Sequence, residues 1–223
     1  MLLFSILISS FCLINFTFAT KSAFFAVLVQ NPTVVQQVVQ IQQNLTKVDP
    51  QFVKFLHNVS YLHVRLNSFE VENETSFQQI LTDLPKVLCN VSTSIPVMFA
   101  GTEIRQNRTL FGKMNAMSSS VITTVHKTIL TYLNSSNITS LDSHEIFHSK
   151  MDIVELDEHR HDDLLEIMQK QTFRLSTGDF IKEIVLFNVE PKGYFHEEIG
   201  RFQLSACKNY WKFMQLLTNR IFD

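Results

Sequence analysis

Apolar residues recur every three to four positions along much of the chain, a spacing typical of amphipathic helices. The segment 33–48 follows Pro32 and alternates valines with glutamines. The segment 50–69 opens with Asp49 and Pro50, a side-chain cap followed by a proline at the first helical position. The stripe of segment 50–69 contains Phe52, Phe55, Leu56, Val59, Leu62, Leu66 and Phe69. We therefore expect two helices before residue 70.

The same spacing continues through the rest of the chain, apart from an exposed connection at 134–140. Further helices are expected at 75–91 (kinked at Pro85), 108–133, 143–152, 157–173, 176–189 and 194–222. The Phe- and Val-rich pieces 24–29 and 184–189 are compatible with strands, but no partner strands stand out. Only five glycines and five prolines are present, too few for the many tight turns of a β-sandwich or barrel. The pattern predicts an all-α protein, a single irregular helical bundle of five to seven helices.

The first 19 residues resemble a secretory signal peptide. Residues 2–18 are uncharged and mostly apolar, and Thr17-Phe18-Ala19 is a small-x-small cleavage site. The alternative is an uncleaved N-terminal signal anchor, because 17 residues approach the length of a spanning helix. No later segment is long and apolar enough to span a membrane, so we expect no membrane span in the mature chain.

Sequons for N-linked glycosylation are unusually frequent after residue 19. Seven N-x-S/T sites occur there, about three times the chance expectation, and each used site must face solvent. The seven asparagines are Asn44, Asn58, Asn73, Asn90, Asn107, Asn134 and Asn137. This excess predicts passage through a eukaryotic secretory pathway and a secreted, extracellular location.

Two cysteines remain in the mature chain, Cys89 and Cys207. In an oxidising compartment an even pair usually forms a disulfide bridge. We therefore predict that they pair, with two buried thiols as the alternative. One bridge does not make a disulfide scaffold, so stability must rest on a hydrophobic core.

The chain divides by charge and by sequons into residues 20–139 and residues 140–223, two helical halves of one domain. Residues 20–139 have nine basic and six acidic residues and all seven sequons. Residues 140–223 have ten basic and fifteen acidic residues and no sequon. Because a glycan hinders close packing, a protein partner is expected to dock on the acidic half. The overall net charge of −2 gives no basic stripe, so nucleic acid is not expected as a partner.

The pattern His144-Glu145-Ile146-Phe147-His148 matches the H-E-x-x-H motif of zinc metallopeptidases. Two histidines four residues apart on a helix can bind one zinc ion, and the glutamate can polarise bound water. A non-catalytic metal site formed by His144, His148, His159 and His161 is the milder alternative. The flanking charges Asp142 and Lys150 favour a third interpretation, a solvated face without metal.

These patterns together favour a non-catalytic extracellular binding protein without a cofactor. Its partner is an unknown extracellular protein. The first alternative is a carrier that holds an apolar ligand in a cavity between helices. The second alternative is a zinc metallopeptidase using the motif at 144–148.

Overall fold

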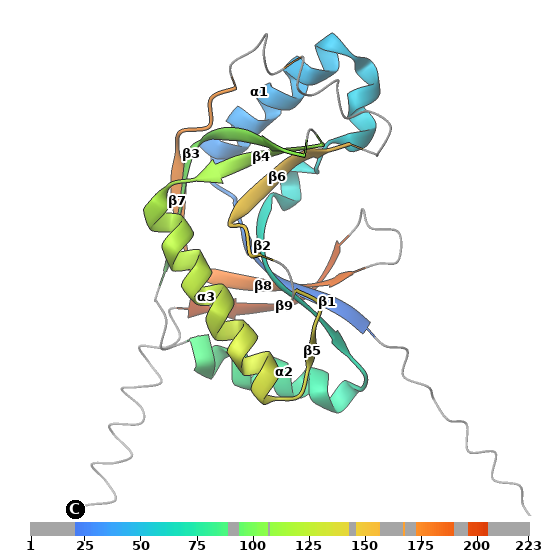
Figure 1. Ribbon diagram of the computed structural model, residues 1–223, viewed down its shortest axis with the longest axis vertical. Coiled ribbons are helices and arrows are strands. Elements are labelled where there is room, and N and C mark those ends of the chain that lie inside the picture. Colours follow the sequence, from blue (N-terminus) through green and yellow to red (C-terminus); the bar gives the residue numbers. More distant parts are fainter. Residues whose placement is uncertain are drawn as a thin grey trace, which may run out of the picture.

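The fold is not a helical bundle but an antiparallel sheet with helices packed against it (Figure 1). The computed structural model describes residues 21–88, 94–106, 108–142, 146–156, 167, 173–189 and 196–204. Nine strands form the sheet in the order β7-β3-β4-β6-β2-β1-β8-β9, and β5 adds to β2. The all-α prediction is therefore wrong.

The elements follow one another along the chain as strands separated by helices. The helices are α1 (Pro32–Val48), α2 (Glu74–Leu88) and α3 (Ala116–Ser135), with two 3-10 helices η1 (Pro50–Phe55) and η2 (Val59–Tyr61). The strands are β1 (Lys21–Leu28), β2 (His63–Val71), β3 (Ile95–Arg105), β4 (Thr109–Met114), β5 (Thr139–Ser140), β6 (Lys150–Glu155), β7 (Gly178–Ile181), β8 (Glu183–Val189) and β9 (His196–Gln203).

The strand order divides the sheet into two halves with the same construction. We call β2-β1-β8-β9 the His63 half-sheet and β6-β4-β3-β7 the Lys150 half-sheet, after the residue with which each inner strand begins. In each half the inner strand is joined to its neighbour through a helix, α1 between β1 and β2 and α3 between β4 and β6. The halves are thus related by an approximate twofold arrangement that leaves no detectable sequence repeat.

The two half-sheets meet along a narrow junction in the middle of the molecule (Figure 1). Strands β2 and β6 pair there at one position, Val64 with Met151. Both side chains are 0% exposed and belong to the main hydrophobic core. Because side chains alternate along a strand, the residues flanking this pair point to the opposite face of the sheet.

Three of the predicted helices exist, whereas the described parts of 50–69, 143–152, 176–189 and 194–222 contain strands; the segment 157–173 lies almost entirely outside the described residues. The helices expected at 33–48 and 75–91 correspond to α1 and α2, with Pro85 inside α2. The helix expected at 108–133 corresponds to α3 but begins only at Ala116.

The clear stripe at 50–69 is instead two 3-10 helices followed by β2, and 178–189 contains β7 and β8. The two segments compatible with strands, 24–29 and 184–189, pair largely with each other as β1 and β8. Such pairing joins segments 160 residues apart, which a local pattern does not reveal.

The expected signal peptide at 1–19, and with it the cleavage site, lies outside the described residues. Within the described part of the chain, no helix combines the length and the apolar character needed to cross a membrane.

Candidate active site

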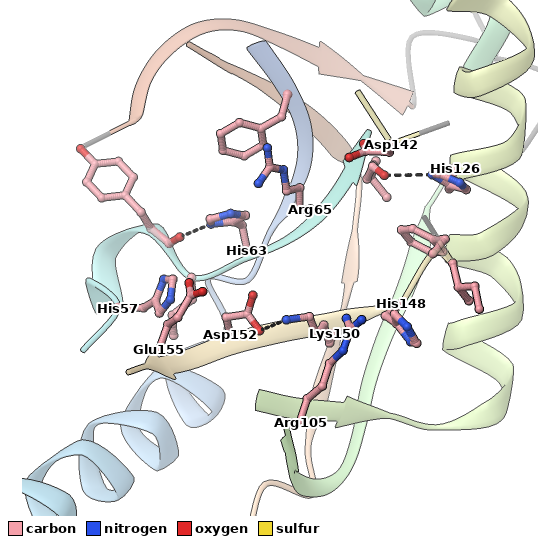
Figure 2. A pocket seen from close by; sticks show the side chains of 16 residues that line it. His57, His63, Arg65, Arg105, His126, Asp142, His148, Lys150, Asp152 and Glu155 are labelled. Atoms are coloured by element: carbon pink, nitrogen blue, oxygen red, sulfur yellow. Dashed lines mark hydrogen bonds and ion pairs between the residues drawn. The ribbon is translucent and has the colours of Figure 1, made fainter. Parts of the chain in front are cut away.

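A cleft of about 420 Å³ lies at the junction between the half-sheets (Figure 2). Its walls come from β2, β6, the 3-10 segment before β2 and the segment before β6. The titratable side chains that line it are labelled in Figure 2. They comprise three cations, three carboxylates and four histidines, so half of the eight histidines of the chain line this cleft.

The antiparallel register at the junction brings four polar side chains together. Since Val64 pairs with Met151, His63 lies across from Asp152 and Arg65 lies across from Lys150. All four line the cleft. The triplets His-Val-Arg and Lys-Met-Asp occupy equivalent places in the two half-sheets, at the start of each inner strand.

His63 is held in one tautomer and one orientation. Its Nδ1 is 2.7 Å from the carbonyl oxygen of Tyr61, and because a carbonyl only accepts, Nδ1 donates. The lone pair is consequently on Nε2, the nitrogen that can accept a proton. The ring packs near Phe24 and Phe187, with centroid distances of 5.3 Å and 6.0 Å. This arrangement is that of a positioned general base.

Cations form a row across three strands of the sheet. Lys113 on β4 is the register partner of Lys150 on β6, and Arg65 follows on β2. Lys150 Nζ is 2.6 Å from Asp152 Oδ1, and Lys113 Nζ is 2.9 Å from Glu103 Oε2. No carboxylate pairs with Arg65 among the described residues. Like charges directly across a sheet are unfavourable, so this row is suited to a bound anion.

The guanidinium of Arg65 is positioned by two contacts that leave its charge uncompensated. Its Nε donates to Ser68 Oγ at 2.7 Å, and its central carbon lies 4.8 Å from the centroid of the Phe24 ring. A planar guanidinium held in this way can donate two parallel hydrogen bonds to a phosphate.

A second hollow of about 500 Å³ adjoins the cleft on the side of the Lys150 half-sheet. Arg105, Phe147, His148 and Lys150 line both spaces. Figure 2 shows Arg105 extending from β3 toward Lys150 and His148. Arg105 is exposed and has no carboxylate partner within the described part of the chain.

The other acidic groups of the cleft are engaged with neighbouring groups. Asp142 accepts from the backbone N–H of Ser68, and Glu155 lies 3.9 Å from Arg108. Neither carboxylate forms an ion pair with Arg65 or Arg105 in the described part of the chain.

His126 on α3 connects β2 to the segment before β6 at the edge of the cleft. It is 6% exposed, donates through Nδ1 to the Leu66 carbonyl at 2.9 Å, and stacks on Phe147 at 4.1 Å. These contacts fix the wall that precedes β6.

Only one of the four predicted metal ligands is among the described residues. His148 is exposed and lines the cleft, whereas His144, His159 and His161 lie outside the described residues. The described residues contain no group of three or more His, Cys, Asp or Glu side chains suited to a metal ion.

Cys89 and Cys207 also lie outside the described residues, so their pairing stays a prediction. The same holds for Asn90 and Asn107. The remaining sequon asparagines are all exposed, and their use stays a prediction; they are Asn44, Asn58, Asn73, Asn134 and Asn137.

The sequence reasoning missed His63, Arg65 and Lys150. A signal for them existed: His63-Val64-Arg65-Leu66 and Lys150-Met151-Asp152-Ile153 both alternate polar and apolar residues, as half-buried strands do. Helical spacing in the surrounding sequence obscured the first of these, and the second overlaps the end of the helix expected at 143–152.

Comparison with known proteins gives both a relative and a fold. No protein-family profile matches the chain. Uncharacterized protein C35A5.6 of Caenorhabditis elegans is 56% identical over 209 residues, covering 90% of this chain and 87% of the nematode protein. The chain belongs to the same family as this protein.

Solved structures share the fold at low identity. Escherichia coli LigT complexed with 3'-AMP has a TM-score of 0.61 at 11% identity, covering 83% of this chain and 99% of LigT. A crystal structure described as a phosphoesterase gives 0.61 at 12% identity, covering 83% and 98%. Usb1 of Kluyveromyces marxianus gives 0.54 at 13% identity, covering 80% and 97%.

These findings correct the functional predictions. The expected non-catalytic binding protein was part of an all-α interpretation, whereas this fold is shared with a phosphoesterase and contains an open polar cleft. The secreted, extracellular location stays a prediction. The expected absence of nucleic-acid partners is likewise overturned, because LigT with this fold is complexed with a nucleotide. That expectation used the net charge of the whole chain, which conceals a local cluster of cations. The cleft is lined by charged groups, so it does not support the alternative that the protein carries an apolar ligand.

Proposed function

We propose that this protein is a phosphoesterase, which binds a phosphate ester in the junction cleft and cleaves a P–O bond with His63 as general base. The observation that carries the proposal is the meeting of His63 with Arg65 and Lys150 on one face of two adjacent strands. A fixed imidazole supplies the base, and the two cations supply charge where the phosphate oxygens must lie.

The chemistry follows from these positions. Arg65 and Lys150 bind the non-bridging oxygens and reduce the negative charge that repels a nucleophile. His63 Nε2 takes the proton of an attacking hydroxyl, from water or from the ligand, as the new O–P bond forms. The P–O bond on the far side then breaks, and its electron pair stays on the departing oxygen. That oxygen takes a proton from the wall formed by the Lys150 half-sheet.

The fold neighbours make a nucleotide phosphate the first ligand to examine. LigT structures contain 3'-AMP, ATP and NADP+, and all share this fold at TM-scores of 0.59 to 0.61. The cleft of about 420 Å³ has room for a ligand of nucleotide size.

The test combines binding with turnover. Purified protein is titrated with 3'-AMP by calorimetry and assayed for release of p-nitrophenol from bis(p-nitrophenyl) phosphate. His63→Gln should reduce turnover by about 100-fold or more while 3'-AMP binding stays within a few-fold, because only the base is lost. Arg65→Gln should weaken binding as well as turnover.

Lys47→Ala is the matched control, since Lys47 is an exposed cation in the last turn of α1 outside the cleft. It should change neither quantity. Turnover that survives His63→Gln unchanged contradicts the assigned base, and absence of both binding and turnover in the unchanged protein contradicts the proposed function.

A further inference from the structure

We infer that Lys150 donates the proton to the departing oxygen. The nucleophile then approaches the phosphorus from the His63 side, and the departing group leaves on the Lys150 side. This inference rests on the proposed function and deepens it. It assigns different roles to two residues that the fold places in equivalent positions.

The asymmetry is visible in the two triplets at the junction. An approximate twofold arrangement relates His63 to Lys150 and Arg65 to Asp152. A ligand phosphate at the junction faces both inner strands. A histidine changes charge between pH 5 and pH 8, whereas a lysine keeps its proton there. Only the His63 side can therefore accept the proton of a nucleophile near neutral pH.

The surroundings of Lys150 suit a proton donor. Its Nζ is 2.6 Å from Asp152, which holds the ammonium in place, and 5.6 Å from the centre of the Phe111 ring. The other charged or titratable groups around it are Lys113 on β4, Arg65 on β2, Arg105 on β3 and His148 before β6, together with the carboxylates Glu103, Asp142 and Glu155, which line the same two spaces. An ammonium held in this position can donate a hydrogen bond, and then its proton, to an oxygen that gains negative charge.

The space beside Lys150 fits a departing group. The second hollow, of about 500 Å³, opens on the same side and is lined by Lys150, Arg105, Phe111 and Phe147. An alcohol or nucleoside leaving from the phosphorus can be accommodated there without crossing the His63 side.

The proton balance closes over one turnover. The attacking hydroxyl gives its proton to His63 and bonds to phosphorus, while the departing oxygen keeps the electron pair of the broken P–O bond and takes a proton from Lys150. The resulting imidazolium then loses a proton to water, and the Lys150 amine regains one from water. No metal, oxidant or further reactant takes part in these steps.

The experiment compares two diesters that differ only in the departing alcohol, the methyl and p-nitrophenyl esters of adenosine 3'-phosphate. Methoxide needs a proton to leave, whereas p-nitrophenolate does not. Lys150→Arg keeps the positive charge but removes the transferable proton. We expect it to slow the methyl ester by about 100-fold or more and the p-nitrophenyl ester by less than about 10-fold. His63→Gln should slow both esters alike.

A second variant tests the proton directly through the pH profile. With Lys150 the methyl-ester rate should rise with pH and then stay level to about pH 9. Lys150→His should convert this into a bell with a falling limb between about pH 6 and pH 8, because the donor now loses its proton in that range.

His148→Ala is the decisive control, because His148 lines the same wall. A methyl-ester defect confined to His148→Ala, or equal slowing of both esters by Lys150→Arg, overturns the assignment of Lys150 while leaving the proposed function intact. No turnover of either ester by the unchanged protein overturns both.

Discussion

The two half-sheets have the same strand arrangement and carry different chemistry. Each places a polar–apolar–polar triplet at the start of its inner strand, and the apolar residues Val64 and Met151 pair across the junction. The polar residues differ completely, since one triplet supplies an imidazole and a guanidinium and the other an ammonium and a carboxylate. In the proposed reaction, the backbone determines where the polar groups lie, and the side chains determine which strand supplies the base and which supplies the acid.

The half-sheets also differ in how deeply their second strands are buried. In β1 every residue from Ala23 to Leu28 is buried, and Phe24 and Phe25 belong to separate apolar clusters on its two faces. In β4 one face is buried throughout, while on the other face Thr109 is buried and Phe111 and Lys113 line the hollow. Strand β1 is thus more deeply buried than β4.

The largest expected effect on stability tests this difference. Phe25 is 0% exposed and stacks on Phe69 at 4.9 Å, so Phe25→Ala should lower the free energy of unfolding by about 3–5 kcal/mol. Phe111→Ala, at the half-buried position in β4, should lower it by less than half as much. Urea unfolding followed by circular dichroism measures both. Equal losses would mean that β1 and β4 are equivalent after all.

The outermost strands, β7 and β9, give a second contrast through their glycines. A Cβ on Gly178 would lie 2.2 Å from the carbonyl oxygen of Val97, a backbone atom that cannot yield without moving β3. A Cβ on Gly200 would lie 3.2 Å from Leu81 Cδ2, the end of a flexible side chain. Gly178→Ala should cost about 1–3 kcal/mol and Gly200→Ala little, measured by thermal and urea unfolding. The reverse order would contradict the close packing of β7 on β3.

An intermediate effect is expected from inorganic phosphate. An anion bound between the half-sheets stabilises the folded state by about 1.4 kcal/mol at ten times its Kd. Arg65→Gln should largely abolish this gain, whereas Lys47→Gln should retain it, as followed by melting temperature against phosphate concentration. A gain that Arg65→Gln leaves intact would place the anion elsewhere.

The smallest effect concerns an ion pair on the exposed edge strand β9. Hydrogen bonds from Arg201 lower the pKa of the Glu198 carboxyl below its ordinary value. Stability from this pair is therefore present above the ordinary pKa of a glutamate and is lost as the pH falls through the lowered value. Both side chains are 36% exposed, so the pair contributes only about 0.3–0.5 kcal/mol.

Glu198→Gln should reduce stability by that amount at pH 7 and by less at pH 2, because the carboxylate takes up a proton as the pH falls. Chemical unfolding at the two pH values provides the measurement. A loss that is the same at both would assign the effect to packing and not to charge.

The spacing of apolar residues predicted the long helices well, because the apolar stripe and the capping residues of a helix all lie within one segment of the sequence. Helix α1 begins beside Pro32 with a cap from Asn31, and its buried residues Val34, Val38, Ile41 and Leu45 are those of the predicted stripe. The same reasoning failed for β2 and β8, because a sheet is decided by partners distant in sequence. A strand flanked by 3-10 helices still shows apolar residues three and four apart.

The site was missed from the sequence for a related reason. His63 and Lys150 are 87 positions apart, and neither belongs to a spaced motif. The histidines that do form a motif, at 144 and 148, directed attention to metal chemistry. Of these, His148 lies beside the cleft through its place before β6 and not through its spacing from His144.

The single backbone pair between Val64 and Met151 has a mechanical consequence. Strands β2 and β6 share only this rung of the ladder, while the bridge between Leu56 and Val154 and a common hydrophobic core hold the two units together. The distance between Arg65 and Lys150 is therefore set by the packing beneath them. An anion that contacts both side chains adds a polar link across the same junction.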